Sequence, residues 1–255
     1  MHLKVVCLNI WIGGLIYEPM VNFLEEERAD IYLLQEVYAG DDDHYAAQYR
    51  AFDALKERLG LPYHHFAPAF IESVGGTHIV QGNAVYSRYP LKEVAVTYYD
   101  VPFGERKNEW SSFHVTPRNL QHLTVKFGST KVHLFNTQGI WGEDGFDHPR
   151  RIEMAQHILR EIGDLQPVIL AGDFNVQPGT TTISLLEAKL QSVFKDELKT
   201  TFNLKRKNIE KFPGFATAVV DMFFVSPDIQ IITHQCPDID ISDHLPLIVK
   251  CEIEA

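Results

Sequence analysis

The sequence predicts a mixed α/β domain, and three observations support this prediction. Apolar runs of strand length alternate with amphipathic segments of helix length along the whole chain. No linker, low-complexity tract or domain break divides the 255 residues, and two-sheet domains commonly reach this size undivided. A weak internal repeat is also visible, because KVVCLN, a helix and DIYLLQEV are echoed by KVHLFN, a helix and PVILAGDFN. We therefore expect a single domain over residues 1–255, with two strand–helix–strand units in a face-to-face pair of sheets.

Four segments have the apolar spacing of amphipathic helices: 17–28, 44–59, 147–162 and 181–190. The second is followed by Gly60 and Pro62, which stop helices. In the third, Asp147 is a candidate N-cap, Pro149 falls in the first turn and Gly163 lies beyond the end. The centre of the chain predicts strands over 84–87, 93–99, 119–127 and 131–136, the last two joined by a hairpin turn at Gly128.

The segment ILAGDFN carries the strongest sign of chemistry, because an apolar strand ends there in polar residues. Asp173 and Asn175 are two residues apart, so strand periodicity points both to the same side. A carboxylate and an amide at the end of a core strand suit a hydrated metal and a phosphate oxygen. Asp, Asn and Gly also form ordinary strand-ending turns, so this segment alone leaves both interpretations open.

Five further core strands carry polar residues of the same kinds. Asn9 ends the run KVVCLN, and Glu36 lies among apolar residues, where a carboxylate is costly unless it is paired or bound to metal. The other strands add Asn136 with Gln138 on one face, Asp221 within an apolar run, and the adjacent Asp243 and His244. So many buried polar residues, with few other buried charges, predict one shared pocket.

Composition narrows the class of protein. The net charge of −11 argues against broad nonspecific affinity for duplex nucleic acid, which relies on Lys and Arg. The basic stretch formed by Lys205, Arg206, Lys207 and Lys211 is either a solvated loop or a substrate contact. The three cysteines favour reduced core residues over disulfides or thiolate metal sites. With no apolar run of ~20 residues and no signal peptide before the first strand, we expect a cytoplasmic monomer.

As a set, LNIW, LLQEV, GDFN, a strand Asp and SDHLPL resemble the endonuclease/exonuclease/phosphatase superfamily in order and span. That superfamily includes deoxyribonucleases, abasic-site nucleases, neutral sphingomyelinases, deadenylases and tyrosyl-DNA phosphodiesterases. The segment GNAVYSRYPL is similar to its central strand and places Asn83 near the site. The resemblance implies a four-layer sandwich, with two central mixed β-sheets packed face to face and helices outside.

The resemblance also implies Mg²⁺-assisted hydrolysis of a phosphate ester, with Mn²⁺ as a substitute. It makes Glu36 the main metal ligand, and Asp243 a further one. Asn9 would orient Glu36 or the phosphate, Asp173 would activate the attacking water, and Asn175 would hold that water or a phosphoryl oxygen. His244, oriented by Asp221, would stabilise the charge of the transition state. The substrate-side candidates are Gln138, Asn136, Asn83, Trp11 and Trp141.

One residue departs from the family pattern. Many members place a His or Tyr where this chain has Gln138, and a glutamine amide donates hydrogen bonds but surrenders no proton at neutral pH. Without a side-chain acid, rates should depend steeply on the acidity of the leaving group.

The function that follows is a phosphodiesterase for nucleic acid or a nucleotide-like substrate. A phospholipid phosphodiesterase resembling sphingomyelinases, a small-molecule phosphatase and a non-catalytic phosphate-binding protein are the alternatives. A structural domain with coincidental polar strand ends would have no metal-dependent activity.

Overall fold

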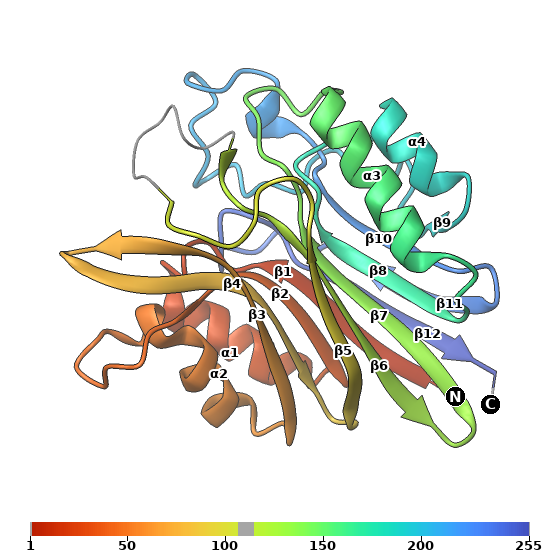
Figure 1. Cartoon of the computed structure of the whole chain (residues 1–255), viewed down its shortest axis with the longest axis horizontal. Helices are drawn as coiled ribbons and strands as arrows, with labels where there is room; N and C mark the ends of the chain where they lie inside the picture. The colour runs from red at the N-terminus through yellow and green to blue at the C-terminus, as the bar shows by residue number, and fades with distance from the viewer. Residues whose placement is uncertain (1, 107–114, 255) are drawn as a thin grey trace.

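Two six-stranded sheets pack face to face in the computed structural model, which describes residues 2–106 and 115–254 (Figure 1). The first sheet has the order β11 (Ile229–Gln235), β12 (Leu247–Ile253), β1 (His2–Asn9), β2 (Ile31–Ala39), β4 (Thr77–Ser87) and β3 (Tyr63–Val74). The second has the order β5 (Leu91–Tyr98), β6 (Asn119–Phe127), β7 (Thr130–Gln138), β8 (Val168–Asp173), β10 (Asp221–Val225) and β9 (Gln191–Ser192).

Helices cover the outer face of each sheet, which gives the expected four layers. Helices α1 (Tyr17–Glu27) and α2 (Ala51–Leu59) pack on the first sheet through a shared apolar cluster. Helices α3 (Pro149–Ile162) and α4 (Thr181–Glu187) pack on the second. The predicted fold class, a four-layer sandwich with two mixed sheets inside, is confirmed.

The internal repeat is present in the topology. Strands β1 and β2 are parallel and joined through α1, and strands β7 and β8 are parallel and joined through α3. Each parallel pair lies at the centre of its sheet and is flanked by antiparallel neighbours. The two central pairs therefore present equivalent carboxyl ends.

Strand alternation explains why polar residues gather at one end of the core. Leu3, Val5 and Cys7 of β1 face the opposite sheet, so Asn9 continues the same face. In β8, Ile169 and Ala171 lie in this inter-sheet core. Asp173 continues their face in the same way, and the apolar layer between the sheets ends in a polar cluster.

Several predicted elements differ from the structure. The strand predicted over 84–87 is the end of the longer β4, which begins at Thr77. The segment 44–59 begins with turns and a short 3₁₀ helix, η1 (Ala47–Arg50), before α2 starts at Ala51. The N-cap of α3 is His148, whereas Asp147 accepts hydrogen bonds from the backbone N–H groups of Thr181 and Thr182 at the start of α4. A carboxylate stabilises the first turn of either helix, so the sequence could not tell which one Asp147 serves. Helix α4 ends at Glu187, three residues earlier than predicted.

Cys7 and Cys251 are buried and Cys236 is partly buried, and all three are free thiols. In the two described ranges, no helix combines the length and the apolar character required to cross a membrane.

Candidate active site

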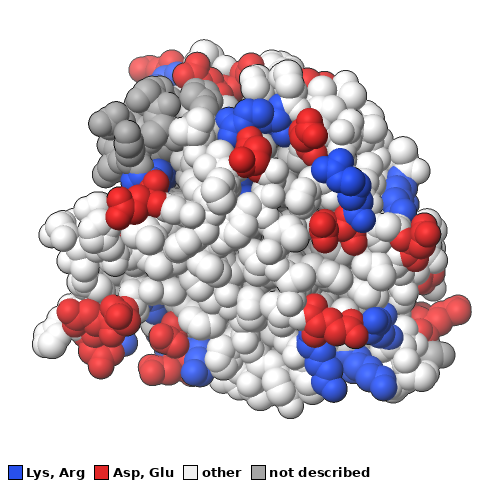
Figure 2. All heavy atoms as spheres, in the orientation of Figure 1, with Lys and Arg blue, Asp and Glu red and all other residues white. Residues whose placement is uncertain are grey.

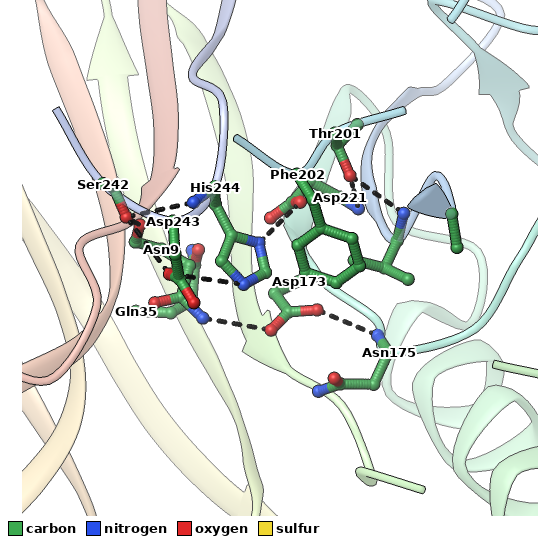
Figure 3. Close-up of polar contacts among 12 residues, drawn as sticks. Asn9, Gln35, Asp173, Asn175, Thr201, Phe202, Asp221, Ser242, Asp243 and His244 are labelled. Carbon is green, nitrogen blue, oxygen red and sulfur yellow. Dashed lines mark hydrogen bonds and ion pairs between the residues drawn. The ribbon is translucent and has the colours of Figure 1, made fainter. Parts of the chain in front are cut away.

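The polar cluster forms where strand ends of both sheets meet. Gln138, Asp173 and Asp221 lie in one row across β7, β8 and β10, because Asp173 is in register with both of the others. The first sheet contributes Asn9 and Glu36 opposite this row. The loop before β12 adds Asp243 and His244, so segments from the whole length of the chain converge here (Figure 3).

Asp173 is held between the two halves of the fold. Its Oδ2 accepts a hydrogen bond from Asn9 Nδ2 at 3.1 Å, and its Oδ1 accepts one from the backbone N–H of Asn175 at 3.0 Å (Figure 3). Asn175 has a left-handed backbone with φ of 56°, an uncommon conformation that often marks functional sites. Burial, together with the charges of Asp221 and Glu36, raises the pKa of Asp173 to about 6.

His244 and Asp221 form a buried pair, with 2.8 Å between His244 Nδ1 and Asp221 Oδ2. The ring of Phe202 packs against His244 with 4.7 Å between ring centroids. Burial alone would lower the pKa of His244, but the carboxylates of Asp221 and Asp243 outweigh it and raise this pKa to about 9. The pair therefore places a charged donor, the imidazolium, beside Asp173.

Glu36 reaches the cluster through an irregularity in β2. The register between β2 and β4 shifts between Leu34 and Val37, and Glu36 has a left-handed φ of 58°. Bulges of this kind redirect a side chain. The Glu36 carboxylate accepts hydrogen bonds from Asn9 Nδ2 at 3.1 Å, the backbone N–H of Ile12 at 2.9 Å and Gln138 Nε2 at 2.8 Å. Although burial opposes it, the hydrogen bond from Asn9 and the charge of Arg118 lower the pKa of Glu36.

The donor set fits a divalent cation with oxygen ligands. Glu36, Asp173 and Asp221 are carboxylates close enough for their charges to raise the pKa of Asp173, and a bound cation would relieve that repulsion. The ligand atoms of Asp173, Asp221 and His244 lie within 4.8 Å of one another. Within this trio, His244 Nδ1 is already hydrogen-bonded to Asp221 Oδ2. Of Glu36, Asp173 and Asp221, Glu36 is the one that lines the neighbouring cleft.

Asp243 and the basic stretch make ion pairs with one another. Lys207 Nζ lies 2.5 Å from Asp243 Oδ2, and Arg206 forms a two-pronged pair with Asp240 at 2.6–2.7 Å. Lys207 also lies 4.2 Å from the centre of the Phe202 ring. Part of the basic stretch is thus paired with carboxylates of the protein itself, and Asp243 shares its carboxylate with a lysine.

A cleft of about 450 Å³ opens above Glu36. Its lining comprises Trp11, Ile12, Glu36, Glu72, Gln81, Arg106, Arg118, Trp141, Phe212 and Asp243. Trp11 and Trp141, both predicted to face the substrate, therefore stand at the cleft. The sequence did not reveal Arg118, because a lone arginine between a proline and a strand looks like an ordinary surface residue.

Three predicted substrate contacts, Gln138, Asn136 and Asn83, are not part of the cleft lining. Gln138 is hydrogen-bonded to two residues that are, Glu36 and Arg118, whereas Asn136 and Asn83 lie deeper in the core. Asn136 faces the same side of β7 as Gln138 but lies two residues deeper, fully buried between the sheets. Its side chain is hydrogen-bonded to Gln35, Gln121 and the backbone carbonyl groups of Leu34 and Ala84. Asn83 is also buried and donates a hydrogen bond to Asn119 across the sheets. Because the side-chain amides of Asn136 and Asn83 form hydrogen bonds between the two sheets, both residues contribute to sheet packing.

The chain matches the family model described as "Endonuclease/Exonuclease/phosphatase family" over residues 8–244. It is 25% identical over 203 residues to "Sphingomyelin phosphodiesterase 2" of Rattus norvegicus, a match that covers 73% of this chain and 44% of the rat protein. The chain thus spans less than half the length of this relative.

Two solved structures share the fold. An endonuclease/exonuclease/phosphatase from Beutenbergia cavernae superposes with a TM-score of 0.72 at 20% identity, covering 99% of this chain and 72% of that chain. A mannosyl-6-phosphatase from Bacteroides thetaiotaomicron superposes with a TM-score of 0.69 at 19% identity, covering 98% and 100%.

Proposed function

The chain belongs to the endonuclease/exonuclease/phosphatase family, and we propose that it is a Mg²⁺-dependent phosphodiesterase for small, nucleotide-like substrates. The observation that carries the proposal is the shared hydrogen-bond network of Asp173, Asn9 and Glu36. The network connects Asp173, the proposed base, to Glu36, which lines the cleft. The hydrogen-bonded pair of His244 and Asp221 lies beside it.

Each residue of the cluster has a role in hydrolysis. Asp173 takes a proton from the water that attacks phosphorus, and Asn175 holds that water or a phosphoryl oxygen. His244, oriented by Asp221, donates a hydrogen bond to a nonbridging oxygen and stabilises the charge that develops there. Asn9 fixes Asp173 and Glu36 relative to each other, because its amide donates to both carboxylates.

Glu36 would hold the cation, with Asp243 as the second candidate after release of Lys207. When bound, Mg²⁺ or Mn²⁺ supplies neutralisation of phosphate charge and polarisation of the phosphoryl group. Hard oxygen donors are the ligands that these cations prefer.

The cleft favours a small substrate over a polymer. Trp11 and Trp141 offer aromatic surfaces to a base or another ring, and Arg106 and Arg118 add positive charge at the cleft. On the face seen in Figure 2, outside the atoms drawn in grey, Lys and Arg side chains are interspersed with Asp and Glu and form no broad basic track. The pairing of Arg206 with Asp240 and of Lys207 with Asp243 further reduces the charge available to a polyanion.

A phospholipid headgroup is the second candidate. It is favoured by the match to "Sphingomyelin phosphodiesterase 2", which extends over 73% of this chain. A phosphodiester with a choline-like cation would present its positive charge to the same aromatic walls, which attract cations through their π faces.

A substrate panel tests the proposal. Bis(p-nitrophenyl) phosphate should be hydrolysed with Mg²⁺ or Mn²⁺, and a chelator should abolish the activity. The panel then compares a nucleotide p-nitrophenyl diester, an oligonucleotide, sphingomyelin vesicles and a sugar phosphate, with Asp173→Asn as the control for contaminating activity. The nucleotide diester should have the highest kcat/KM. Sphingomyelin in that place would favour the second candidate, and no metal-dependent hydrolysis of any substrate would contradict the proposal.

A further inference from the structure

Arg118 is a buried cation that is connected to the Glu36 carboxylate through Gln138. Arg118 directly precedes β6 in the chain. It is only 7% exposed, and it lines the cleft. Its Nη1 donates a hydrogen bond to Gln138 Oε1 at 2.6 Å, and Gln138 Nε2 donates in turn to Glu36 Oε1 at 2.8 Å. Arg118 is therefore two hydrogen bonds away from Glu36.

Arg118 differs from two other shielded arginines. Arg106 forms an ion pair with Glu72, and Arg151 forms one with Asp144 at 3.3 Å. Within residues 2–106 and 115–254, Arg118 has no carboxylate partner, and its Nε is buried without a hydrogen-bond acceptor. Burying a charge without a counterion is costly, so packing alone does not account for this residue.

A continuous hydrogen-bond network connects Arg118 with Asp173, the proposed base. The connections run from Asp173 through Asn9 to Glu36, and from Glu36 through Gln138 to Arg118. In an in-line displacement the attacking and leaving oxygens lie on opposite sides of phosphorus. Arg118 lines the cleft and Asp173 does not, so with the water held at Asp173 a departing oxygen on the cleft side of phosphorus lies on the side of Arg118.

We propose that Arg118 is a catalytic residue that stabilises the negative charge on the leaving oxygen, in a position where Gln138 cannot donate a proton. This inference rests on the proposed phosphodiesterase function. Gln138 is a positioning residue in this arrangement, since its amide oxygen holds Arg118 and its amide nitrogen holds Glu36.

The step balances without an acid from the protein. The oxygen of water bonds to phosphorus, and the bond from phosphorus to the leaving oxygen breaks with its electron pair on that oxygen. One proton of the water passes to Asp173 and is later released to solvent. Arg118 donates a hydrogen bond to the departing alkoxide or phenolate but keeps its own proton, and the product is protonated by bulk water.

The test is a leaving-group series under single-turnover conditions at saturating metal. Phosphodiesters with dinitrophenyl, nitrophenyl, phenyl and alkyl leaving groups are compared for wild type, Arg118→Gln and Arg118→Lys. Removing a donor to a developing oxyanion typically costs about 10²–10³-fold, and the need for it grows as the leaving group becomes less acidic. Arg118→Gln should therefore lose roughly 10²-fold or more on phenyl and alkyl esters and less than about 10-fold on the dinitrophenyl ester.

Two controls make the result specific. Arg88→Gln removes an arginine that pairs with Asp30 beyond the opposite end of β4, and it should leave the series unchanged. Added guanidinium ion at millimolar concentration should partly restore phenyl-ester hydrolysis by Arg118→Gln, while substrate affinity and melting temperature stay near those of wild type.

The outcomes separate the two proposals. A steeper dependence on leaving-group acidity in Arg118→Gln, with rescue by guanidinium, supports the role of Arg118. An equal loss on every ester, or no loss on any, overturns that role while phosphodiesterase activity of the wild type stands. If Arg118→Gln does not fold, the same leaving-group series on Arg118→Lys decides between these outcomes. Failure of the wild type to hydrolyse any ester refutes the proposed function itself.

Discussion

Two regions of polar side chains lie next to each other between the sheets. They differ in charge and in how completely their hydrogen-bonding atoms have partners. The amide layer, deeper in the core, consists of Gln35, Asn83, Asn119, Gln121 and Asn136. The charged cluster at the strand ends consists of Asn9, Glu36, Asp173, Asp221 and His244. No buried side-chain nitrogen or oxygen of the amide layer lacks a partner, whereas Asp221 Oδ1 in the charged cluster does.

This difference indicates which buried polar groups serve the fold and which serve a ligand. Neutral amides that satisfy one another hold two sheets in a fixed register at little electrostatic cost. Carboxylates that repel one another, as around Asp173, are costly to bury, and the proposed cation would reduce that cost. Substitutions in the two regions should therefore have opposite effects on activity and stability.

Asp173→Asn should have the largest effect. Loss of the base should reduce turnover by roughly 10²–10⁴-fold at saturating metal, the range typical of general-base catalysis. Because the amide removes a buried carboxylate from beside Asp221 and Glu36, the melting temperature should stay the same or rise. Steady-state kinetics and thermal denaturation check both parts, and near-normal turnover would show that another group activates the water.

Glu36→Gln should act on metal affinity. The Mg²⁺ concentration for half-maximal activity should rise at least ~10–100-fold, since even residues that only support metal ligands have effects of this size. Titration of activity and calorimetry measure the shift. Glu93→Gln, which disrupts an exposed pair with Lys131, is the matched control. An unchanged metal requirement would remove Glu36 from the metal site.

Asn136→Ala should reverse the pattern, with a loss of stability and little change in chemistry. It leaves the partners of a buried amide unsatisfied, at a cost of about 3 kcal/mol. For a chain of this size that corresponds to a drop of roughly 6–12 °C in melting temperature. Turnover below the transition should stay within about threefold. Asn9→Ala, the same substitution in the charged cluster, should instead lose most of its turnover, and equal activity losses in both variants would remove the distinction between the regions.

Arg206→Gln should have the smallest effect. Its pair with Asp240 is partly exposed, and such pairs contribute about 0–1 kcal/mol. If Arg206 pairs with Asp240 and does not contact a phosphate of the oligonucleotide, the salt dependence of oligonucleotide binding should be the same in the variant and the wild type. A slope that is shallower by about one unit would identify a phosphate contact.

Periodicity and local motifs predicted much of the fold. The repeated strand–helix–strand unit indicated the two central parallel pairs, and alternation placed Asn136 and Gln138 on one face of β7. Strand alternation does not show, however, how far from the end of the core a residue lies along its strand. A residue at the strand end and one two positions earlier differ by about 7 Å along the strand. This distance separates Gln138, which is hydrogen-bonded to Glu36 and Arg118 of the cleft lining, from Asn136 in the amide layer.

The clustering of candidate residues was predictable where a motif fixes several residues at once, as in GDFN and SDHLPL. Arg118 and the partners of the basic stretch depend on contacts between distant segments, such as Arg118 with Gln138 and Lys207 with Asp243. No local spacing encodes these contacts, and a lone arginine or lysine in a loop has the same sequence signature whether it is solvated or paired.

Direct attack of water on phosphorus is the central claim, and the stereochemistry at phosphorus tests it most directly. A phosphorothioate diester of one configuration is hydrolysed in water labelled with a heavy oxygen isotope, and the configuration of the product is determined. Water activated by Asp173 and displacing the leaving oxygen in one step should give inversion, with the label on phosphorus. Retention would reveal a covalent enzyme intermediate, and a label in the released alcohol would reveal cleavage of the carbon–oxygen bond. Either of these results would contradict the account.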